Sequence, residues 1–147
     1  MALAERRAEV VWEGNLTQGS GRVHVGSGAV GDLPVTFASR TERADGKTSP
    51  EELIAAAHAT CFAMAFSNTL NTAGSPPEKL TVDAVCALDR VEGGLKITTM
   101  NLDVRGRVPG IDAAKFEELA HKAEQGCPVS GALRNNVRIN LTAHLEQ

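Results

Sequence analysis

Apolar and polar residues alternate along two short stretches near the start of the chain, residues 6–14 and residues 21–26. Such alternation is typical of half-buried β-strands, and the turn-forming residues between the two stretches predict a hairpin. A second glycine-rich turn leads into residues 33–40, which we predict to be a third strand ending at Arg40. The first 40 residues are therefore expected to form a small β-sheet.

A long helix is predicted to begin at Pro50 and to end near Ala73. Ser49 is a suitable N-cap, proline suits the first helical position, and Glu52, three residues after the cap, completes a capping box. Gly74 and the two prolines that follow it shortly afterwards end the helix. Small apolar residues cover most of the circumference, a pattern typical of a helix that is buried on nearly all sides. Its alanines would also let a neighbouring backbone come close.

The remaining residues predict two strands, two helices and a final strand. Two long alternating stretches separated by a Gly-Gly turn form a hairpin, and an amphipathic stretch capped by Asp112 forms a helix. A short helix then begins at Cys127 and Pro128. The segments are residues 79–92, 95–110, 111–126, 127–136 and 137–145. The order βββ-α-ββ-αα-β predicts one α+β domain over residues 1–147, with a mainly antiparallel sheet.

Composition and charge exclude several classes of function. The chain has 147 residues and a formal net charge of −3, and it has no cluster of basic residues, so we expect no nucleic-acid partner. We expect no apolar run long enough to span a bilayer and find no signal-peptide pattern, so we expect a soluble, cytoplasmic protein without a membrane partner. The glycine-rich turns lack the lysine and the following Ser or Thr of a phosphate-binding loop.

Three cysteines, Cys61, Cys86 and Cys127, carry the main chemical question. Their odd number and wide spacing suit neither a disulfide framework nor a zinc site. In a reducing cytosol a disulfide is more often transient and catalytic than structural. Cys86 alternates with apolar neighbours in a predicted strand, and we interpret it as a packing residue. Cys61 lies in the long apolar helix, where a cysteine is usually an inert, protonated core residue unless a cation lies close to it.

Three polar residues could polarise the Cys61 thiol. His58 precedes it by three residues and lies on the same helix face, a Cys–His pairing that is weak evidence for a thiol hydrolase. Arg40 offers a permanent charge and a planar fork that suits a thiolate, a carboxylate or a peroxide oxygen; the alternative is a solvated strand-end charge. Glu51 precedes Cys61 by ten residues, about 15 Å along a helix axis. A shared site would therefore require Glu51 from a second copy of the helix, packed antiparallel.

Cys127 is the second candidate thiol. It stands at the start of a predicted helix, where the helix dipole lowers the pKa of a thiol. It follows Cys61 by 66 residues, so a disulfide requires the fold to bring the two Cα atoms within about 7 Å. If the fold does so, the two cysteines are a plausible attacking and resolving pair.

Two segments of the chain resemble the OsmC/Ohr family of osmotically inducible and organic hydroperoxide resistance peroxidases. They are TSPEELIAAAHATCFAMAFSNTL, which contains Cys61, and EQGCPVSGALRNNVRINL, which contains Cys127. The arginine that ends VTFASR and the segment AAAHATCF are closer to the OsmC branch than to the Ohr branch. The resemblance implies an OsmC-like fold with antiparallel sheets wrapped around long central helices, in an intertwined homodimer with active sites at the subunit interface.

The resemblance also implies a thiol peroxidase that needs no metal or cofactor. By position, Cys61 is the peroxidatic cysteine, Cys127 the resolving cysteine, and Glu51 and Arg40 the catalytic ion pair. The implied reaction reduces organic hydroperoxides or hydrogen peroxide to alcohols or water through a Cys61 sulfenic acid and a Cys61–Cys127 disulfide. A dithiol of the lipoyl type recycles the enzyme, and the implied role is defence against oxidative or osmotic stress.

Two alternatives from other classes stay open at this point. One is a non-catalytic dimeric module that binds a small ligand in an apolar pocket, with incidental cysteines. The other is a thiol hydrolase that uses Cys61 and His58. Three apolar residues near the thiol fit either a wall for a hydrophobic substrate tail or a protein core; they are Phe62, Met64 and Phe66.

Overall fold

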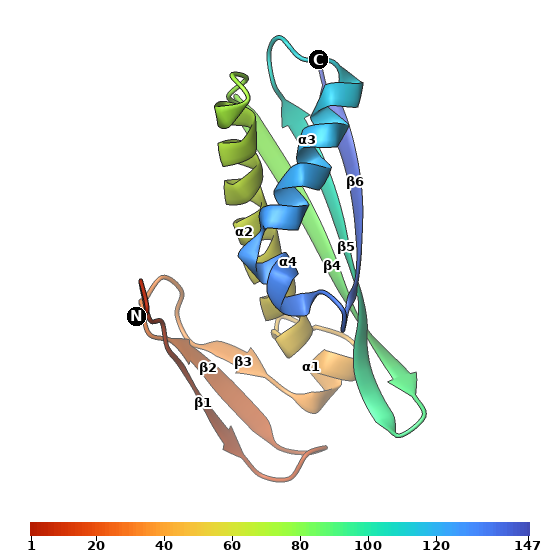
Figure 1. Ribbon diagram of the computed structural model, residues 1–147. Helices are drawn as coiled ribbons and strands as arrows, with labels where there is room; N and C mark the ends of the chain where they lie inside the picture. Colours follow the sequence, from red (N-terminus) through yellow and green to blue (C-terminus); the bar gives the residue numbers. More distant parts are fainter. The chain divides into compact units, whose positions relative to one another are not determined.

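The computed structural model describes all 147 residues and contains two three-stranded sheets and four helices (Figure 1). In chain order the elements are β1 (Ala8–Glu13), β2 (Ser20–Val25), β3 (Leu33–Val35), α1 (Phe37–Thr41), α2 (Pro50–Thr72), β4 (Lys79–Val91), β5 (Gly94–Arg107), α3 (Ala113–Gly126), α4 (Pro128–Leu133) and β6 (Arg138–Glu146). The chain divides into two compact units, residues 1–53 and residues 54–147, with the boundary inside the first turns of α2. The α+β class is confirmed.

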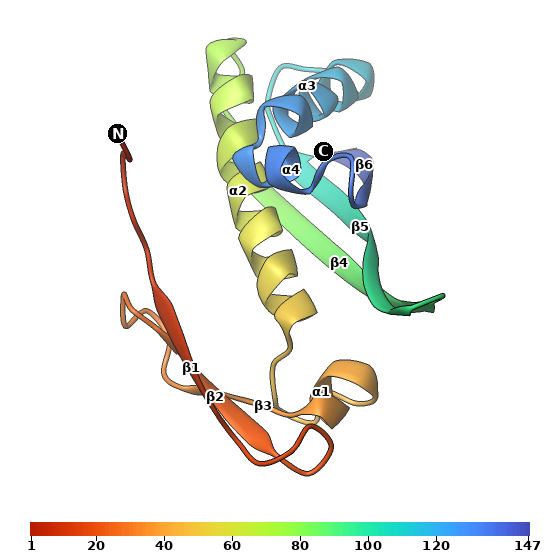
Figure 2. The same ribbon diagram turned by 60° about the horizontal axis from the view of Figure 1, so that its bottom comes forward.

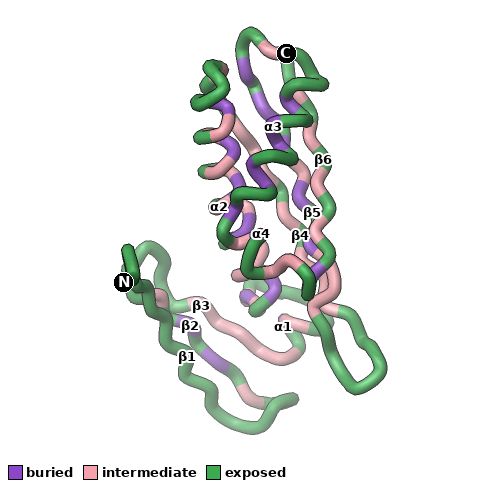
Figure 3. Tube along the Cα trace, viewed as in Figure 1, coloured by how far each residue is buried: buried purple, intermediate pink, exposed green.

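The first unit contains the antiparallel sheet β1-β2-β3, as the alternating pattern predicts. This sheet has almost no core of its own: every residue of β1 is exposed, and Val23 is its one buried apolar side chain (Figure 3). Consecutive β1 residues point to opposite faces, so Val10, Val11 and Trp12 leave apolar surface open on both faces. Within this unit, nothing covers that surface.

The prediction that residues 33–40 form one strand is wrong in its second half, because the strand β3 ends at Val35 and a short helix, α1, follows. Thr36 caps this helix. Its hydroxyl accepts from the Ser39 N–H, and the Ser39 hydroxyl accepts from the Thr36 N–H, both at 3.0 Å. This reciprocal capping box satisfies two backbone donors and starts a helix within a segment whose composition suggests a strand. Arg40 therefore lies on a helix and not at a strand end.

Helix α2 starts and ends as the sequence predicts. The Glu52 N–H donates to the Ser49 hydroxyl at 3.2 Å, but the Glu52 carboxylate accepts from Thr48, so only half of the expected capping box forms. Gly74 adopts a positive φ of 86°, and the Ser75 N–H closes onto the carbonyl of Leu70. That pair of features is a Schellman ending, which glycine favours because it has no Cβ.

Helix α2 differs from expectation in its burial and apolar length. By length and composition alone it is apolar enough to cross a membrane, contrary to our expectation that the chain has no such run, although core helices of soluble proteins pass the same test. Only 22% of its most apolar 18-residue window is buried within the single chain. One face of α2 is exposed. It carries the small side chains of Ala56, Thr60 and Asn68, together with Met64. The expected burial on nearly all sides is therefore not reached by this chain alone.

The second unit is a sheet covered on one face by helices (Figures 1 and 2). Strands β4 and β5 form the expected antiparallel hairpin, with a bulge at Ala87 and Leu88. Strand β6 pairs with β5 in parallel, so the mainly antiparallel fold contains one parallel pair. The cause is the connection: helices α3 and α4 carry the chain back along the sheet, as a parallel pairing requires.

The core of this unit lies between the sheet and helices α2 and α3. Phe62 and Phe66 are fully buried on α2, and Phe66 lies 5.0 Å, centroid to centroid, from Phe116 of α3. The bare backbone of Gly106 in β5 gives the Phe116 ring room, because a Cβ there would lie 2.6 Å from it. The other core residues include Leu70, Met100, Leu102, Val104, Leu119, Ala120 and Ala123. The packing fixes α2 against α3 and leaves Cys61, next to Phe62, facing the segment that follows α3.

Candidate functional site

Cys61 and Cys127 lie in contact within the second unit. Cys61 is on α2, and Cys127 is the residue between α3 and α4, serving as C-cap of the first and N-cap of the second. Both are free thiols, and their Sγ atoms are 3.3 Å apart. Cys127 is 1% exposed, whereas Cys61 is only partly buried. The arrangement therefore offers one thiol to solvent and keeps the other immediately behind it.

The surroundings of Cys61 in the single chain disfavour its thiolate. Burial raises the pKa of Cys61 above its ordinary value of 9.0, and the neighbouring Cys127 raises it further. A hydrogen bond from the backbone N–H of Val129 lowers the pKa of Cys61 but does not outweigh burial. A nucleophilic thiol must be deprotonated, so this cysteine needs a positive charge that the second unit does not bring to it.

The first unit contains a buried ion pair between Arg40 and Glu51. The Arg40 guanidinium donates from Nε and Nη2 to Glu51 Oε1, at 3.0 and 2.8 Å, and Nε also approaches Oε2 at 3.3 Å. The Glu51 side chain is 8% exposed and that of Arg40 32%. Helix α1 presents the arginine and the first turn of α2 presents the glutamate, within one chain. Nη1 has no protein partner and can still donate to another group.

The four predicted site residues thus form two pairs. The structure brings Cys61 to Cys127 in the second unit, and Arg40 to Glu51 in the first. We predicted that Glu51 from a second copy of the helix would complete the site. Within one chain, Glu51 pairs with Arg40, which lies on α1; that a second copy brings Glu51 to Cys61 stays a prediction. The Arg40–Glu51 pair as a whole could therefore stabilise a thiolate.

Sequence reasoning missed a third contact, between His58 and Ser130. His58 Nε2 lies 2.7 Å from Ser130 Oγ, and both residues are fully buried. Burial lowers the pKa of His58, and nearby Glu124 acts in the opposite direction. The hydrogen bond that His58 makes is to Ser130, and no hydrogen bond joins it to Cys61 in support of the thiol-hydrolase interpretation. The available signal was the equal spacing of three residues between His58 and Cys61 and between Cys127 and Ser130.

A second ion pair flanks Cys127. Arg134 Nη2 donates to the Glu124 carboxylate at 3.0 Å and to the Glu124 backbone carbonyl at 3.1 Å. Glu124 is 7% exposed and lies three residues before Cys127. The contact joins the last turn of α3 to the end of α4, so the short turn that carries Cys127 is held from both sides.

A groove opens beside Cys61 between α2 and the end of α3. Its volume is about 460 Å³, and its lining residues are Cys61, Met64, Ala65, Asn68, Thr69, Ala123, Gly126 and Pro128. Met64 is 70% exposed, whereas Phe62 and Phe66 are fully buried core residues. Of the three residues expected as a possible apolar wall, only Met64 therefore lines the space next to the thiol.

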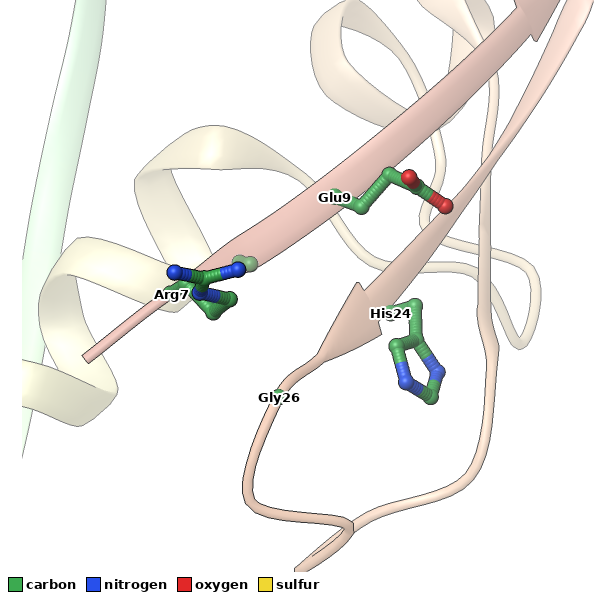
Figure 4. Close-up of a pocket in the computed structure, with 5 residues that line it drawn as sticks. Arg7, Glu9, His24 and Gly26 are labelled. Carbon is green, nitrogen blue, oxygen red and sulfur yellow. The ribbon is translucent and has the colours of Figure 1, made fainter.

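Another open pocket lies on the first unit, where it offers no comparable chemistry. It has a volume of about 610 Å³ and is lined by Arg7, Ala8, Glu9, His24 and Gly26. Figure 4 shows the Glu9 and His24 side chains beside each other on adjacent strands. All five residues are exposed, and none is a nucleophile. The chain contains no cluster of three His, Cys, Asp or Glu residues that could hold a metal ion.

Comparison with known proteins decides the family. Residues 43–142 match the family model described as OsmC-like protein. The chain belongs to the OsmC-like family. It is 41% identical over 135 residues to Peroxiredoxin OsmC of Escherichia coli (strain K12), covering 92% of this chain and 94% of that protein. It is 35% identical over 100 residues to an organic hydroperoxide resistance protein of Xanthomonas axonopodis pv. citri, covering 65% and 66%. The higher identity supports the OsmC branch.

Solved structures agree with this OsmC-like assignment. An organic hydroperoxide resistance protein OsmC from Legionella pneumophila superposes with a TM-score of 0.75 at 26% identity, over 98% of this chain and 99% of that chain. The organic hydroperoxide resistance protein OhrB of Bacillus subtilis gives 0.74 at 27% identity, over 93% and 97%. The OsmC-like fold expected from the two cysteine segments is therefore confirmed.

Proposed function

We propose that this OsmC-like protein is a thiol peroxidase that reduces organic hydroperoxides with Cys61 and Cys127. The observation that carries the proposal is the pair of free thiols with sulfurs 3.3 Å apart, of which only one is open to solvent. Relatives named peroxiredoxin OsmC and organic hydroperoxide resistance protein support the same activity. A role in defence against hydroperoxide stress follows from it.

Cys61 attacks first, because its sulfur is the accessible one. As a thiolate it bonds to the distal oxygen of the hydroperoxide, the O–O bond breaks, and the alkoxide leaves as the alcohol after taking up a proton. Cys61 is then a sulfenic acid. The Cys127 sulfur attacks that sulfur, the S–O bond breaks, and the hydroxyl leaves as water with the Cys127 proton. The resulting disulfide protects Cys61 from irreversible oxidation.

The thiolate needs a cation, and we assign that role to the ion pair of a second chain. Arg40 of the partner subunit would bring its free Nη1 toward Cys61, and Glu51 of the partner subunit would fix the plane of the guanidinium. Two observations support a homodimer with the active sites at its interface. Helix α2 leaves its small-residue face uncovered, and β1 leaves Val10, Val11 and Trp12 exposed on both faces. Apolar surface of this kind marks a protein–protein contact.

The groove beside Cys61 would take the organic part of the substrate. Met64 and Ala65 give it apolar walls, and Asn68 and Thr69 add polar groups farther along α2. An alkyl or aryl hydroperoxide buries apolar area there, whereas hydrogen peroxide reaches the same sulfur without that gain. We therefore assign organic hydroperoxides as the preferred class.

Recycling requires an external dithiol, for which a lipoyl-type compound is our candidate, and the cytoplasm is the compartment that supplies such reductants. Cys127 is 1% exposed and Cys61 is partly exposed. An incoming thiolate therefore attacks the Cys61 sulfur of the disulfide and releases Cys127 as a thiol. The second thiol of the reductant then displaces Cys61 and leaves an oxidised dithiol.

The remaining alternative is a dimeric module that binds a small ligand in the groove without chemistry. An assay of cumene hydroperoxide consumption with dithiothreitol separates the two functions. A peroxidase loses turnover when Cys61→Ser is introduced, and Cys127→Ser keeps one turnover but is not recycled through the intramolecular disulfide. A binding module consumes no peroxide in any form. Equal peroxide loss in the wild type and both variants would overturn the proposed function.

A further inference from the structure

Helix α2, which carries Cys61, and helix α4, which Cys127 caps, are joined by a second contact one turn from the thiols. His58 stands three residues before Cys61 on α2, and Ser130 stands three residues after Cys127 on α4. The distance from His58 Nε2 to Ser130 Oγ is 2.7 Å, and that between the sulfurs is 3.3 Å. The same pair of helices is thus connected twice, once by a hydrogen bond and once by the thiol contact.

Packing α2 against α4 through this buried hydrogen bond is less favourable in free energy than packing them through apolar side chains. His58 is fully buried, and its Nδ1 has no partner, which costs stability because the nitrogen has lost its water. An apolar side chain of similar volume would avoid that cost. What the imidazole adds is direction: a hydrogen bond at 2.7 Å fixes the distance and the rotation of α4 against α2, which apolar packing does not.

Besides the Val129 N–H, which reaches the Cys61 sulfur, two contacts tie this segment to α3 and not to α2. Arg134 ties the end of α4 to Glu124 of α3, and the Cys127 N–H donates to the Glu124 carbonyl. Among hydrogen bonds between side chains, the His58–Ser130 contact and the thiol pair itself are the two that link α2 to α4. During turnover the thiol pair breaks and re-forms. Of these two side-chain contacts, the His58–Ser130 bond is the one that persists.

We propose that His58 is a positioning residue for both cysteines. Through Ser130 it holds α4 so that the Cys127 sulfur and the Val129 N–H both face the Cys61 sulfur. The first contact sets how fast Cys127 displaces water from the Cys61 sulfenic acid, and the second supplies a hydrogen bond to the Cys61 sulfur. The consequence for turnover rests on the proposed peroxidase function, but the effect on the dithiol itself does not.

The test therefore starts with the dithiol, in the absence of peroxide. The full-length protein is equilibrated in glutathione buffers, and the Cys61–Cys127 disulfide is counted after thiol trapping and mass analysis. His58→Leu keeps the volume but removes the bond, and Ser130→Ala removes it from the other side. We expect each to lower the equilibrium constant for disulfide formation about tenfold or more, because the effective concentration of one thiol at the other falls.

Two further variants separate positioning from stability. His58→Gln can place its amide near the position of Nε2, and should restore most of the disulfide equilibrium. Leu70→Val, in the same core but nine residues from Cys61, lowers Tm without touching either cysteine, and should leave the equilibrium unchanged. If His58→Leu fails to fold, Ser130→Ala and His58→Gln still decide the question.

The peroxide assay is read separately from the dithiol assay. A wild type that consumes no cumene hydroperoxide refutes the proposed function, while the glutathione equilibria still decide the role of His58. A slower single-turnover disulfide formation in Ser130→Ala, with the first step unchanged, supports the proposal. Disulfide equilibria and Cys61 alkylation rates equal to wild type in both His58→Leu and Ser130→Ala would overturn it.

Discussion

Glu51 accepts two hydrogen bonds from Arg40 within the same chain, at 2.8 and 3.0 Å, and in doing so leaves one guanidinium nitrogen unpaired. Because the Glu51 side chain is 8% exposed, the carboxylate cannot turn away into water without breaking a buried ion pair. Arg40 is therefore held in one orientation before any substrate arrives. Pre-orientation of this kind is what electrostatic catalysis requires of a cation.

Replacing Arg40 should remove the charge that we propose as the activator of Cys61. We expect Arg40→Met to lower the kcat/KM for cumene hydroperoxide by about 10²–10³-fold, the usual effect of deleting one preorganised stabilising group. Arg105→Met is a matched control, because Arg105 also forms an ion pair, with Asp83, but both side chains are exposed. Comparable losses in the two variants would show that the effect is not specific to the site.

The pH dependence of Cys61 alkylation tests the same residue without peroxide. Burial raises the pKa of Cys61 in the single chain, so without a cation the thiolate forms only at alkaline pH. With Arg40 of the partner subunit in place, the thiolate should form near neutral pH. The iodoacetamide rate of Cys127→Ser should therefore reach half its maximum at a lower pH than that of the same variant carrying Arg40→Met. Coinciding profiles would remove Arg40 from the site.

Replacing Cys127 should separate reduction of peroxide from recycling. We expect Cys127→Ser to consume about one equivalent of hydroperoxide and then stall as a sulfenic acid, which further peroxide oxidises to the sulfinic acid. Mass spectrometry measures both states. The wild type should instead show loss of two hydrogen masses for a disulfide. Steady turnover of Cys127→Ser with dithiothreitol at the wild-type rate would exclude a resolving role.

His58 should make the fold sensitive to mild acid. Burial lowers the pKa of His58 below its ordinary value of 6.5, against the opposing effect of Glu124. The unfolded chain therefore binds the proton more readily, and stability rises with pH. The contribution is fully present above pH 6.5 and is lost as the pH falls through the lowered pKa. Between pH 7.5 and pH 5, Tm should fall more in the wild type than in His58→Leu, and a parallel fall in both would contradict this.

Most of the element order could be predicted from sequence, because hydrophobic periodicity and capping residues are local. Arg40 was misplaced on a strand, since the capping box at Thr36 competes with a short apolar run and five helical residues leave no periodic pattern. The parallel pairing of β6 was missed because strand direction depends on the whole connection through α3 and α4.

In the candidate site, too, local sequence features could be predicted and contacts between distant segments could not. Cys61 and Cys127 were recognisable from their segments, and the 3.3 Å contact agrees with the pairing that the resemblance implied. The direction of the Arg40–Glu51 pair and the His58–Ser130 bond were not recognisable, because both join residues from separate helices. The equal three-residue spacing of His58 and Ser130 from the two cysteines was a signal, but spacing along one helix does not show which helix packs against it.

The uncovered face of α2 predicts that oligomeric state and activity fall together. We expect the wild type to be a dimer by light scattering, and Ala56→Arg to shift it toward a monomer with at least tenfold lower peroxidase activity, because the charge would be buried at the contact. Glu118→Arg, on an exposed position of α3, is the control and should remain a dimer. An active monomeric Ala56→Arg protein would show that one chain is sufficient.

Subunit complementation tests the two-chain site most directly. Cys61→Ser and Arg40→Met chains, each inactive alone, are co-expressed with different tags, and the mixed dimer is purified through both. If Arg40 of one subunit serves Cys61 of the other, the mixed dimer contains one intact site and should recover about half of the wild-type activity per dimer, as two-fold symmetry requires. A mixed dimer as inactive as either parent would contradict a site shared between two chains.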